Sequence, residues 1–290
     1  MHAGSSQTAR TAAAARAAHL IVDQPPAIFS DTFAAKLLGD EADEYVAYHR
    51  AHGSHVVLAG ARGQVVCRSR LAEDSLATAI ERGVRQYVIL GAGLDSFAYR
   101  SALARSVRIF EVDHGATQAW KRHQLAAAGI TEPENLTFVA ADLEAGTLAA
   151  DLIRAGLDPD VPAFVSWLGV TMYLTTEAIG RTFADLALLA PGSEVVADYM
   201  LPADMRDGAG NTYVELVGPL TAERGEPWLT FLSPAEMSRL LARHGLRPLR
   251  HVVQRDIGDA ATWDRSDSLR PVELAVIAHA TVASRELRMS

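Results

Sequence analysis

Five apolar runs of strand length recur through the middle of this chain, each separated from the next by a segment of helical composition. Runs that are apolar throughout, instead of alternating apolar with polar residues, are typical of parallel strands covered by helices on both faces. The pattern therefore predicts an α/β fold with a mostly parallel sheet. The runs lie at 86–90, 107–112, 136–140, 163–168 and 194–199, with helical candidates near 97–104, 116–128, 145–155 and 176–190.

The two ends of the chain depart from this rhythm. The first 83 residues contain no run that predicts a strand, and helices are expected there over 8–22, 29–38, 41–52 and 71–82. Glycine, proline and aromatic residues at 200–232 interrupt the later alternation and indicate an insertion that caps the sheet. We therefore divide the chain into an N-terminal helical extension at 1–83 and a core at 84–290, with a cap insertion at about 200–232.

Two short signals organise the C-terminal part. Ser233-Pro234-Ala235-Glu236 combines a helix cap, a first-turn proline and a glutamate three residues after the cap, which predicts a helix start. Two final strands are expected at about 248–254 and 272–280, as antiparallel neighbours.

Composition limits the function classes. The net charge of −8 argues against broad binding of nucleic-acid backbones, which needs clustered lysine and arginine. A single cysteine, Cys67, excludes a disulfide within the chain. No run approaches the about 18 apolar residues of a membrane span, and the N-terminus lacks a secretory signal. We expect a cytoplasmic protein that acts on small molecules, without nucleic-acid or membrane partners and with its oligomeric state unknown.

A metal site is not expected either. His49, His52 and His55 recur at three-residue spacing, but no nearby cysteine or paired acid completes a set of ligands.

The first strand-length run is followed by Gly91-Ala92-Gly93-Leu94-Asp95, and the second ends in Asp113. Two glycines let the backbone turn sharply and approach a ligand, while an acid at the next strand's end accepts hydrogen bonds from ribose hydroxyls. The plainer alternatives are a tight strand-to-helix turn for the glycines and a helix cap for Asp113. Together the two motifs favour a pocket for an adenosine-bearing cofactor.

Two such cofactors are candidates. A nicotinamide dinucleotide fits less well, because Ser96 stands where the dinucleotide fingerprint has its third glycine. S-adenosylmethionine fits better, because the third run is followed by Asp142-Leu143. There a carboxylate would accept from the adenine amine while leucine packs on the ring, unless Asp142 caps the following helix. A nicotinamide-dependent oxidoreductase and a non-catalytic S-adenosylmethionine-binding module remain the alternative functions.

Together with Arg68-Ser69-Arg70 and Gly169-Val170-Thr171-Met172-Tyr173-Leu174, these motifs resemble the leucine carboxyl methyltransferase family, in its bacterial S-adenosylmethionine-dependent branch, over roughly residues 8–200. The resemblance implies an enzyme with the Rossmann-like class I methyltransferase fold: a seven-stranded, mostly parallel sheet with one reversed strand. It also implies S-adenosylmethionine as the cofactor and transfer of its methyl group.

The resemblance further implies roles for single residues. The backbone of the Gly91-Ala92-Gly93 turn approaches the methionine portion of the cofactor, and Arg68 pairs with its carboxylate. Asp113 holds the ribose, and Asp142 with Leu143 frames the adenine.

One position departs from the family pattern. Leu168 stands where the family often has a glutamate after the fourth strand, so Trp167 or backbone groups are expected to line that wall instead. Tyr173 lies where class I enzymes face the acceptor and is the catalytic candidate, with a buried core position as its alternative.

The acceptor follows from the chemistry of the transfer. A carboxylate is ionised at neutral pH and needs no base, whereas a phenol with a pKa of about 10 benefits from one. No histidine closely follows the fourth or fifth strand-length run. The sequence therefore favours an O-methyltransferase acting on a small or medium organic acceptor with a carboxylate or an acidic hydroxyl.

Overall fold

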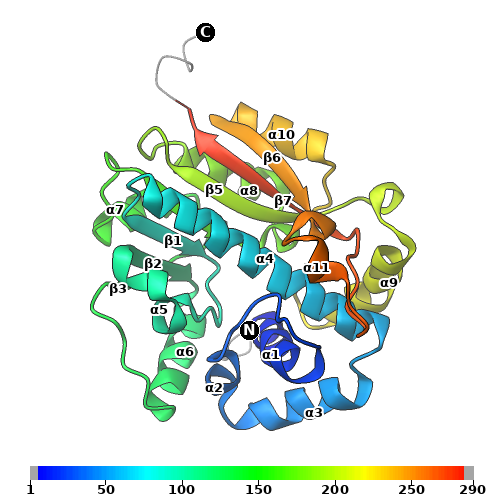
Figure 1. The fold of residues 1–290 in the computed structure, drawn as a ribbon. Helices are drawn as coiled ribbons and strands as arrows, with labels where there is room; N and C mark the ends of the chain where they lie inside the picture. Colours follow the sequence, from blue (N-terminus) through cyan, green and yellow to red (C-terminus); the bar gives the residue numbers. More distant parts are fainter. Residues whose placement is uncertain (1–5, 284–290) are drawn as a thin grey trace.

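A twisted central sheet organises the computed structural model, which describes residues 6–283 (Figure 1). Within these residues seven strands pair in the order β3-β2-β1-β4-β5-β7-β6. The strands are β1 (Gln86–Leu90), β2 (Arg108–Asp113), β3 (Leu136–Ala140), β4 (Ala163–Trp167), β5 (Glu194–Met200), β6 (Leu246–Val253) and β7 (Ala275–Val282).

The pairing confirms the predicted sheet. Strands β1 to β5 run parallel, and β7 pairs antiparallel with both β5 and β6, so β7 is the reversed strand. Leu90 at the end of β1 lies between Val112 of β2 and Trp167 of β4. The carboxyl ends of the central strands are therefore level with one another, and the loops that follow them meet at one edge.

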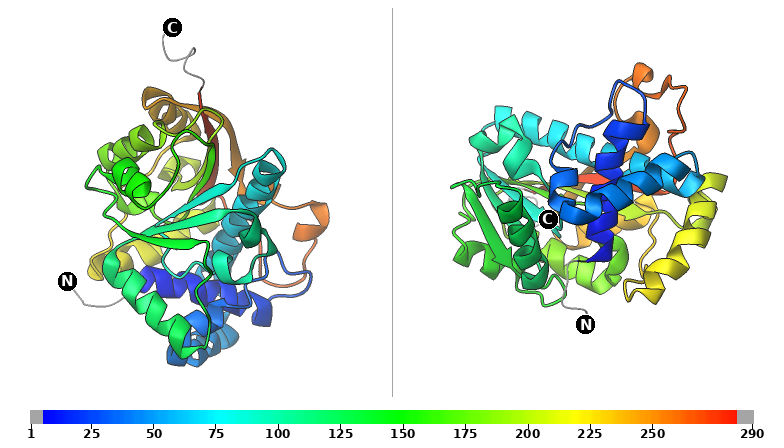
Figure 2. Two further views of the ribbon diagram at one scale, coloured as in Figure 1. Left: turned by 90° about the vertical axis from the view of Figure 1, so that its left-hand side faces the viewer. Right: turned by 90° about the horizontal axis from the view of Figure 1, so that it is seen from below.

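Helices cover both faces of the sheet, as the apolar strands predict (Figure 2). One hydrophobic cluster joins the sheet to α7, α8 and α10, and another joins its opposite face to α4 and α5. Helix α6 lies on the α4 side, where Lys121 pairs with Glu111 of β2 at 2.6 Å. The bounds are α4 (Val56–Glu81), α5 (Phe97–Arg100), α6 (Gly115–Ala127), α7 (Leu148–Arg154), α8 (Thr176–Leu186) and α10 (Pro234–Arg243).

Helix α4 is much longer than the predicted segment at 71–82. Gly60 and Gly63 argue against a helix in its first half, because glycine weakens a helix interior. In the structure both glycines leave space for side chains from other elements. A Cβ on Gly60 would lie 3.2 Å from the Tyr213 ring, and one on Gly63 would lie 2.7 Å from the Gln254 amide.

The cap insertion contains α9 (Gly208–Glu223), which its glycine and proline content did not predict. Asp207 begins this helix by accepting a hydrogen bond from the Gly210 amide at 2.7 Å. Ala209, Tyr213 and Val214 turn its inner face toward the sheet.

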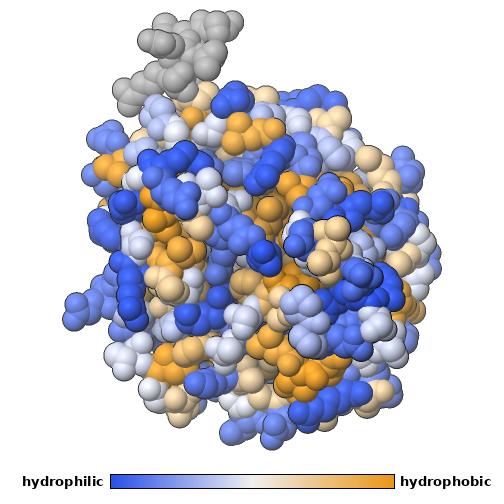
Figure 3. All heavy atoms as spheres, viewed as in Figure 1, coloured by the Kyte–Doolittle hydropathy of each residue, from blue (hydrophilic) through white to orange (hydrophobic). Residues whose placement is uncertain are grey.

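The N-terminal extension consists of α1 (Gln7–Val22), α2 (Ala34–Leu38) and α3 (Ala42–His52), followed by α4. Figure 1 shows α1 to α3 as a separate layer below the sheet. Within residues 6–283 no helix has both the length and the apolarity of a membrane span, and the face in Figure 3 mixes hydrophilic with hydrophobic residues.

A buried ion pair fixes α1 against α4. Asp23, which follows α1, accepts hydrogen bonds from the Nε and Nη2 atoms of Arg62, both at 2.8 Å. His19 Nδ1 lies 2.9 Å from the same carboxylate. Burial alone would raise the pKa of Asp23, but the bonds from His19 and Arg62 outweigh it and lower this pKa. The pair therefore holds α1 against α4, the helix that carries Arg68. Helix α1 also covers the Gly91-Ala92-Gly93 turn, which we call the glycine loop.

We expect Asp23→Asn to lower the free energy of unfolding by about 3–5 kcal/mol, because it leaves the buried Arg62 guanidinium without its counter-charge. The control is Asp74→Asn, which breaks the exposed Arg70–Asp74 pair of 2.7 Å and should cost at most about 1 kcal/mol. Urea denaturation measures both changes. Equal effects of the two substitutions would contradict the anchoring role of the buried pair.

Candidate functional site

The residues of the candidate site lie at the carboxyl ends of five neighbouring strands. In sheet order these are Asp142 after β3, Asp113 at the end of β2, Gly93 after β1, Gly169 after β4 and Asp198 in β5. Parallel α/β sheets bind ligands at this edge, because the loops that follow the strands open a crevice there.

The glycine loop and Asp113 are joined directly. The Gly93 amide donates to Oδ2 of Asp113 at 2.6 Å, and the Ala92 amide donates to the carbonyl of Val112 at 3.0 Å. The other carboxylate oxygen of Asp113 accepts from the His114 amide at 2.7 Å. His114, not Asp113, occupies the N-cap position of α6. Asp113 thus ties two strand ends together, and the helix-cap alternative does not describe it.

Glycine is required at position 93 by conformation and by space. Its φ of +48° lies in the left-handed region that favours glycine. A Cβ there would lie 3.1 Å from the Cβ of Ala9 on α1. Arg16 of α1 also donates to the carbonyl of Leu94 at 2.6 Å. Helix α1 therefore lies directly against the loop.

Asp142 lies next to Asp113 along the edge, because the Ala141 amide donates to the Asp113 carbonyl at 3.1 Å. The exposed Asp142 carboxylate accepts a local bond from the Glu144 amide at 2.8 Å. Thr147 occupies the N-cap position of α7, so Asp142 does not cap the next helix. Leu143 packs against the core on the α7 side.

The loop after β4 closes on the glycine loop. Gly91 has a φ of +62°, and a Cβ on it would lie 2.4 Å from Cγ2 of Val170. Gly169 has a φ of +73°, and its Cβ would meet the Arg68 guanidinium at 2.4–2.8 Å. Arg68 therefore lies over the loop that follows β4, beside the glycine loop of β1.

Asp198 was not identified from the sequence. It lies in β5 with its side chain only 2% exposed, and it accepts hydrogen bonds from Nη1 of Arg68 at 3.2 Å and from the Gly169 amide at 2.6 Å. The available signal was a carboxylate among the apolar residues that follow Glu194 in this run. Such a group needs partners when it is buried, and here they come from α4 and from the loop after β4.

The expectation for the Trp167 side chain is wrong. Its ring is fully buried on the α8 face, edge-on to Phe183 with ring centroids 5.5 Å apart. The last residue of β4 points its side chain into that core, away from the edge. Leu168, the next residue, packs into the core on the opposite face. Neither side chain supplies the wall expected in place of the family glutamate.

Tyr173 ends the short helix η3 (Thr171–Tyr173) and joins an aromatic cluster with residues of the cap insertion. In that cluster the rings of Tyr213 and Trp228 stack at 6.2 Å. Burial raises the pKa of Tyr173 above its ordinary value and that of Tyr213 to about 12, with the Arg68 charge opposing both shifts. Both phenols therefore stay protonated at neutral pH, beside the Arg68 guanidinium.

The start of α1 is tied to the cap insertion through Glu226. Ser6 Oγ donates to Oε1 of Glu226 at 2.6 Å, and Thr8 Oγ1 donates to Oε2 of the same residue. Glu226 acts to raise the pKa of Tyr173, so this contact lies close to the aromatic cluster. The N-terminal extension and the cap insertion thus meet at Glu226, near the aromatic cluster.

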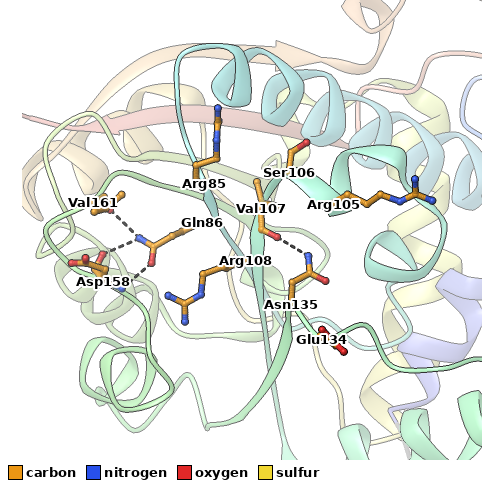
Figure 4. Close-up of a pocket in the computed structure, with 10 residues that line it drawn as sticks. All are labelled: Arg85, Gln86, Arg105, Ser106, Val107, Arg108, Glu134, Asn135, Asp158 and Val161. Atoms are coloured by element: carbon orange, nitrogen blue, oxygen red, sulfur yellow. Dashed lines mark hydrogen bonds between the residues drawn. The ribbon is translucent and has the colours of Figure 1, made fainter.

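A hollow of about 590 Å³ lies at the opposite, amino edge of the sheet (Figure 4). Its polar groups bond with one another: Gln86 with Asp158, and Asn135 with the Val107 carbonyl. The side chains of its three arginines point in different directions in Figure 4. These are Arg85, Arg105 and Arg108. We therefore place the candidate site at the carboxyl edge.

The chain is similar to known proteins over much of its length. The model of the family "Leucine carboxyl methyltransferase" matches residues 9–187. A Bacillus subtilis protein named "Putative S-adenosyl-L-methionine-dependent methyltransferase YktD" is 34% identical over 217 residues, covering 74% of this chain and 71% of its own. A relative from Saccharopolyspora erythraea, named as the same kind of enzyme, is 32% identical over 235 residues, covering 77% of this chain and 76% of its own.

Two solved structures share the fold. One, from Thermobifida fusca, superposes with a TM-score of 0.63 at 18% identity, covering 98% of this chain and 97% of its own. The other, from Streptomyces avermitilis, has the same TM-score at 20% identity, covering 97% of this chain and 98% of its own.

The close contact between the glycine loop and the loop after β4 should affect the stability of the fold. We expect Gly91→Ala to cost about 1–2 kcal/mol for the left-handed conformation and about 1–3 kcal/mol more for the collision with Val170. Gly192→Ala is the control, because Gly192 has a φ of +86° and no atom within 4 Å of its Cβ position. Urea denaturation compares the two variants.

Removing the Val170 methyl groups should relieve the second contribution. Gly91→Ala is expected to cost less in a Val170→Ala background than in the wild-type chain. A cost that equals the Gly192→Ala value in both backgrounds would show that the loops do not press on each other.

Proposed function

Since the chain belongs to the leucine carboxyl methyltransferase family and is an S-adenosylmethionine-dependent methyltransferase, we propose that it methylates an oxygen atom of a small or medium organic acceptor. The acceptor group is a carboxylate or an acidic hydroxyl. The observation that carries this proposal is the convergence of the glycine loop, Asp113 and Asp142 with Arg68 and the two tyrosines at one edge of the sheet.

The residues along this edge suit the parts of the cofactor in order. Asp142 and Leu143 would frame the adenine. Asp113 would hold the ribose, because a carboxylate has about four acceptor sites and, among the described residues, two amides donate to its oxygens. The Gly91 to Gly93 turn would accommodate the methionine chain, since glycine lets the backbone turn sharply and approach a ligand closely.

Arg68 would pair with the cofactor carboxylate. A guanidinium has five N–H donors in a planar fork, and within residues 6–283 the Arg68 side chain makes one hydrogen bond, to Asp198. This leaves donors for a two-point contact with a carboxylate.

S-adenosylmethionine supplies a methyl group on a positively charged sulfonium, so the donor is already activated. The protein has to align the acceptor and exclude water, and such positioning is worth effective molarities of about 10⁵–10⁸ M. The contact of Ser6 and Thr8 with Glu226 would help close the site. Tyr173 would donate a hydrogen bond to the acceptor, because its raised pKa keeps the phenol protonated.

The polar groups around the aromatic cluster of Tyr173 and Tyr213 favour an acceptor that is already ionised. A guanidinium and two protonated phenols can donate hydrogen bonds but cannot remove a proton at neutral pH. A carboxylate needs no proton removed and would be held by the phenol donors.

We expect S-adenosylhomocysteine to bind the purified wild-type chain in isothermal titration calorimetry. Asp113→Ala should weaken this binding by at least about a hundredfold, or about 2.7 kcal/mol, because the ribose and the Gly93 amide both lose their acceptor. Asp160→Ala, the same substitution on the exposed surface before β4, should leave the affinity within about twofold of wild type. Circular dichroism checks that both variants are folded.

Absence of binding by the wild-type chain at high micromolar ligand would overturn the proposed function. Unchanged affinity in Asp113→Ala would remove Asp113 from the site.

The acceptor class is tested with a panel of carboxylic acids and phenols and a radiolabelled methyl donor. A carboxylate product is a methyl ester, which mild alkali cleaves to methanol, whereas a phenol product is an ether that survives. We expect alkali-labile product, and Tyr173→Phe should lower its rate by about tenfold or more while the S-adenosylhomocysteine affinity stays unchanged. Label that is stable to alkali, or transferred to nitrogen, would contradict a carboxylate acceptor.

A further inference from the structure

We propose that Asp198 is a positioning residue of the cofactor site: it orients the Arg68 guanidinium toward the carboxylate-bearing end of the cofactor and fixes the loop at Gly169 over which the guanidinium lies. This inference rests on the proposed function of the same edge. It assigns a role to a buried acid that lies in β5, outside the sequence motifs.

The two oxygens of Asp198 have separate partners from separate elements. Oδ2 accepts from Nη1 of Arg68 on α4 at 3.2 Å, and Oδ1 accepts from the Gly169 amide at 2.6 Å. The Asp198 carbonyl also accepts from the Thr171 hydroxyl at 2.6 Å. One residue therefore fixes both the arginine and the loop over which the arginine lies.

The burial of the pair is unequal, and this inequality indicates its role. The Asp198 side chain is 2% exposed, whereas that of Arg68 is 19% exposed. The carboxylate is thus withdrawn behind the guanidinium, with both oxygens occupied. The guanidinium keeps open surface and free donors.

Gly169 leaves room for the Arg68 guanidinium. Because Gly169 has no Cβ, the guanidinium lies where that atom would be, within 2.4–2.8 Å of its position. The long side chain of arginine loses rotamer entropy when it is fixed in one conformation. An anchored guanidinium has lost it before the ligand arrives, which is how supporting contacts raise the precision of a binding residue.

Stability alone does not explain the buried pair of Asp198 and Arg68. A buried ion pair contributes little net stability, because desolvation offsets the attraction. The same acid could instead have been an apolar residue like its neighbours in β5. Its connection to Arg68 and to the loop beside the glycine turn gives it a use in binding.

The test compares two ligands that share adenosine and a thioether. S-adenosylhomocysteine carries the amino acid portion, and 5′-methylthioadenosine lacks it. Asp198→Asn keeps the shape of the side chain and removes its charge. We expect it to weaken S-adenosylhomocysteine by about tenfold or more, while 5′-methylthioadenosine binds within about twofold of wild type. Asp74→Asn, the matched control at the exposed Arg70 pair of α4, should change neither affinity.

The double variant separates positioning from direct contact. If Asp198 acts through Arg68, then Arg68→Met/Asp198→Asn should bind S-adenosylhomocysteine as Arg68→Met does, within about twofold, because residues acting as a unit are not additive. Additive losses would mean that Asp198 contacts the ligand by itself. Equal weakening of both ligands by Asp198→Asn would mean that it only maintains the fold. Either result overturns the proposal.

Two safeguards keep the outcome interpretable. Should Asp198→Asn fail to fold, Asp198→Ser takes its place, because its hydroxyl keeps an acceptor for the Gly169 amide without the charge, and it should show the same selective loss of S-adenosylhomocysteine binding. A failure of the proposed function looks different, because the wild-type chain would then bind neither ligand.

Discussion

The hydrogen bond from the Gly93 amide to the Asp113 carboxylate, 2.6 Å long, joins the two strand ends on which the rest of the edge is built. It exists because parallel pairing places the ends of β1 and β2 side by side. It also requires the left-handed turn that glycine allows at position 93. Each neighbouring contact along the edge extends from this pair, to Asp142 on one side and to the loop after β4 on the other.

The N-terminal extension completes this edge and is more than an appendage to the sheet. Helix α1 lies against Gly93 through Ala9, and its first residues bond to Glu226 of the cap insertion. The buried pair of Asp23 and Arg62 holds α1 to α4, the helix that carries Arg68. The stability of a distant ion pair is therefore linked to the geometry of the site, because one helix layer serves both.

Much of the fold followed from the sequence because its signals are local. Continuous apolar runs predicted the parallel strands, and the late strand pair was recognised after the cap insertion. The first half of α4 and the whole of α9 were missed. Gly60, Gly63 and Gly210 reduce helix propensity there, but tertiary packing overrides propensity when a small residue lets another element approach closely.

The residues of the candidate site also fall into those that the sequence predicted and those that it did not. The glycine loop, Asp113 and Asp142 stand at strand ends, where short motifs place them at one edge. Asp198 and Glu226 act through partners 130 and 220 residues away in the sequence, and no local pattern encodes such pairs. The expectation for the Trp167 side chain has a related cause. Successive residues of a strand point to opposite faces of the sheet, and Trp167 is still part of β4, so its side chain points into the core.

The most direct test of the central claim is a crystal structure of the chain with S-adenosylhomocysteine. We predict one nucleoside lying across the carboxyl edge, with its adenine at Asp142, its ribose hydroxyls on Asp113, its thioether beside the glycine turn and its carboxylate on Arg68. Ligand density elsewhere, for example in the hollow at the amino edge beside Arg108, would contradict the claim.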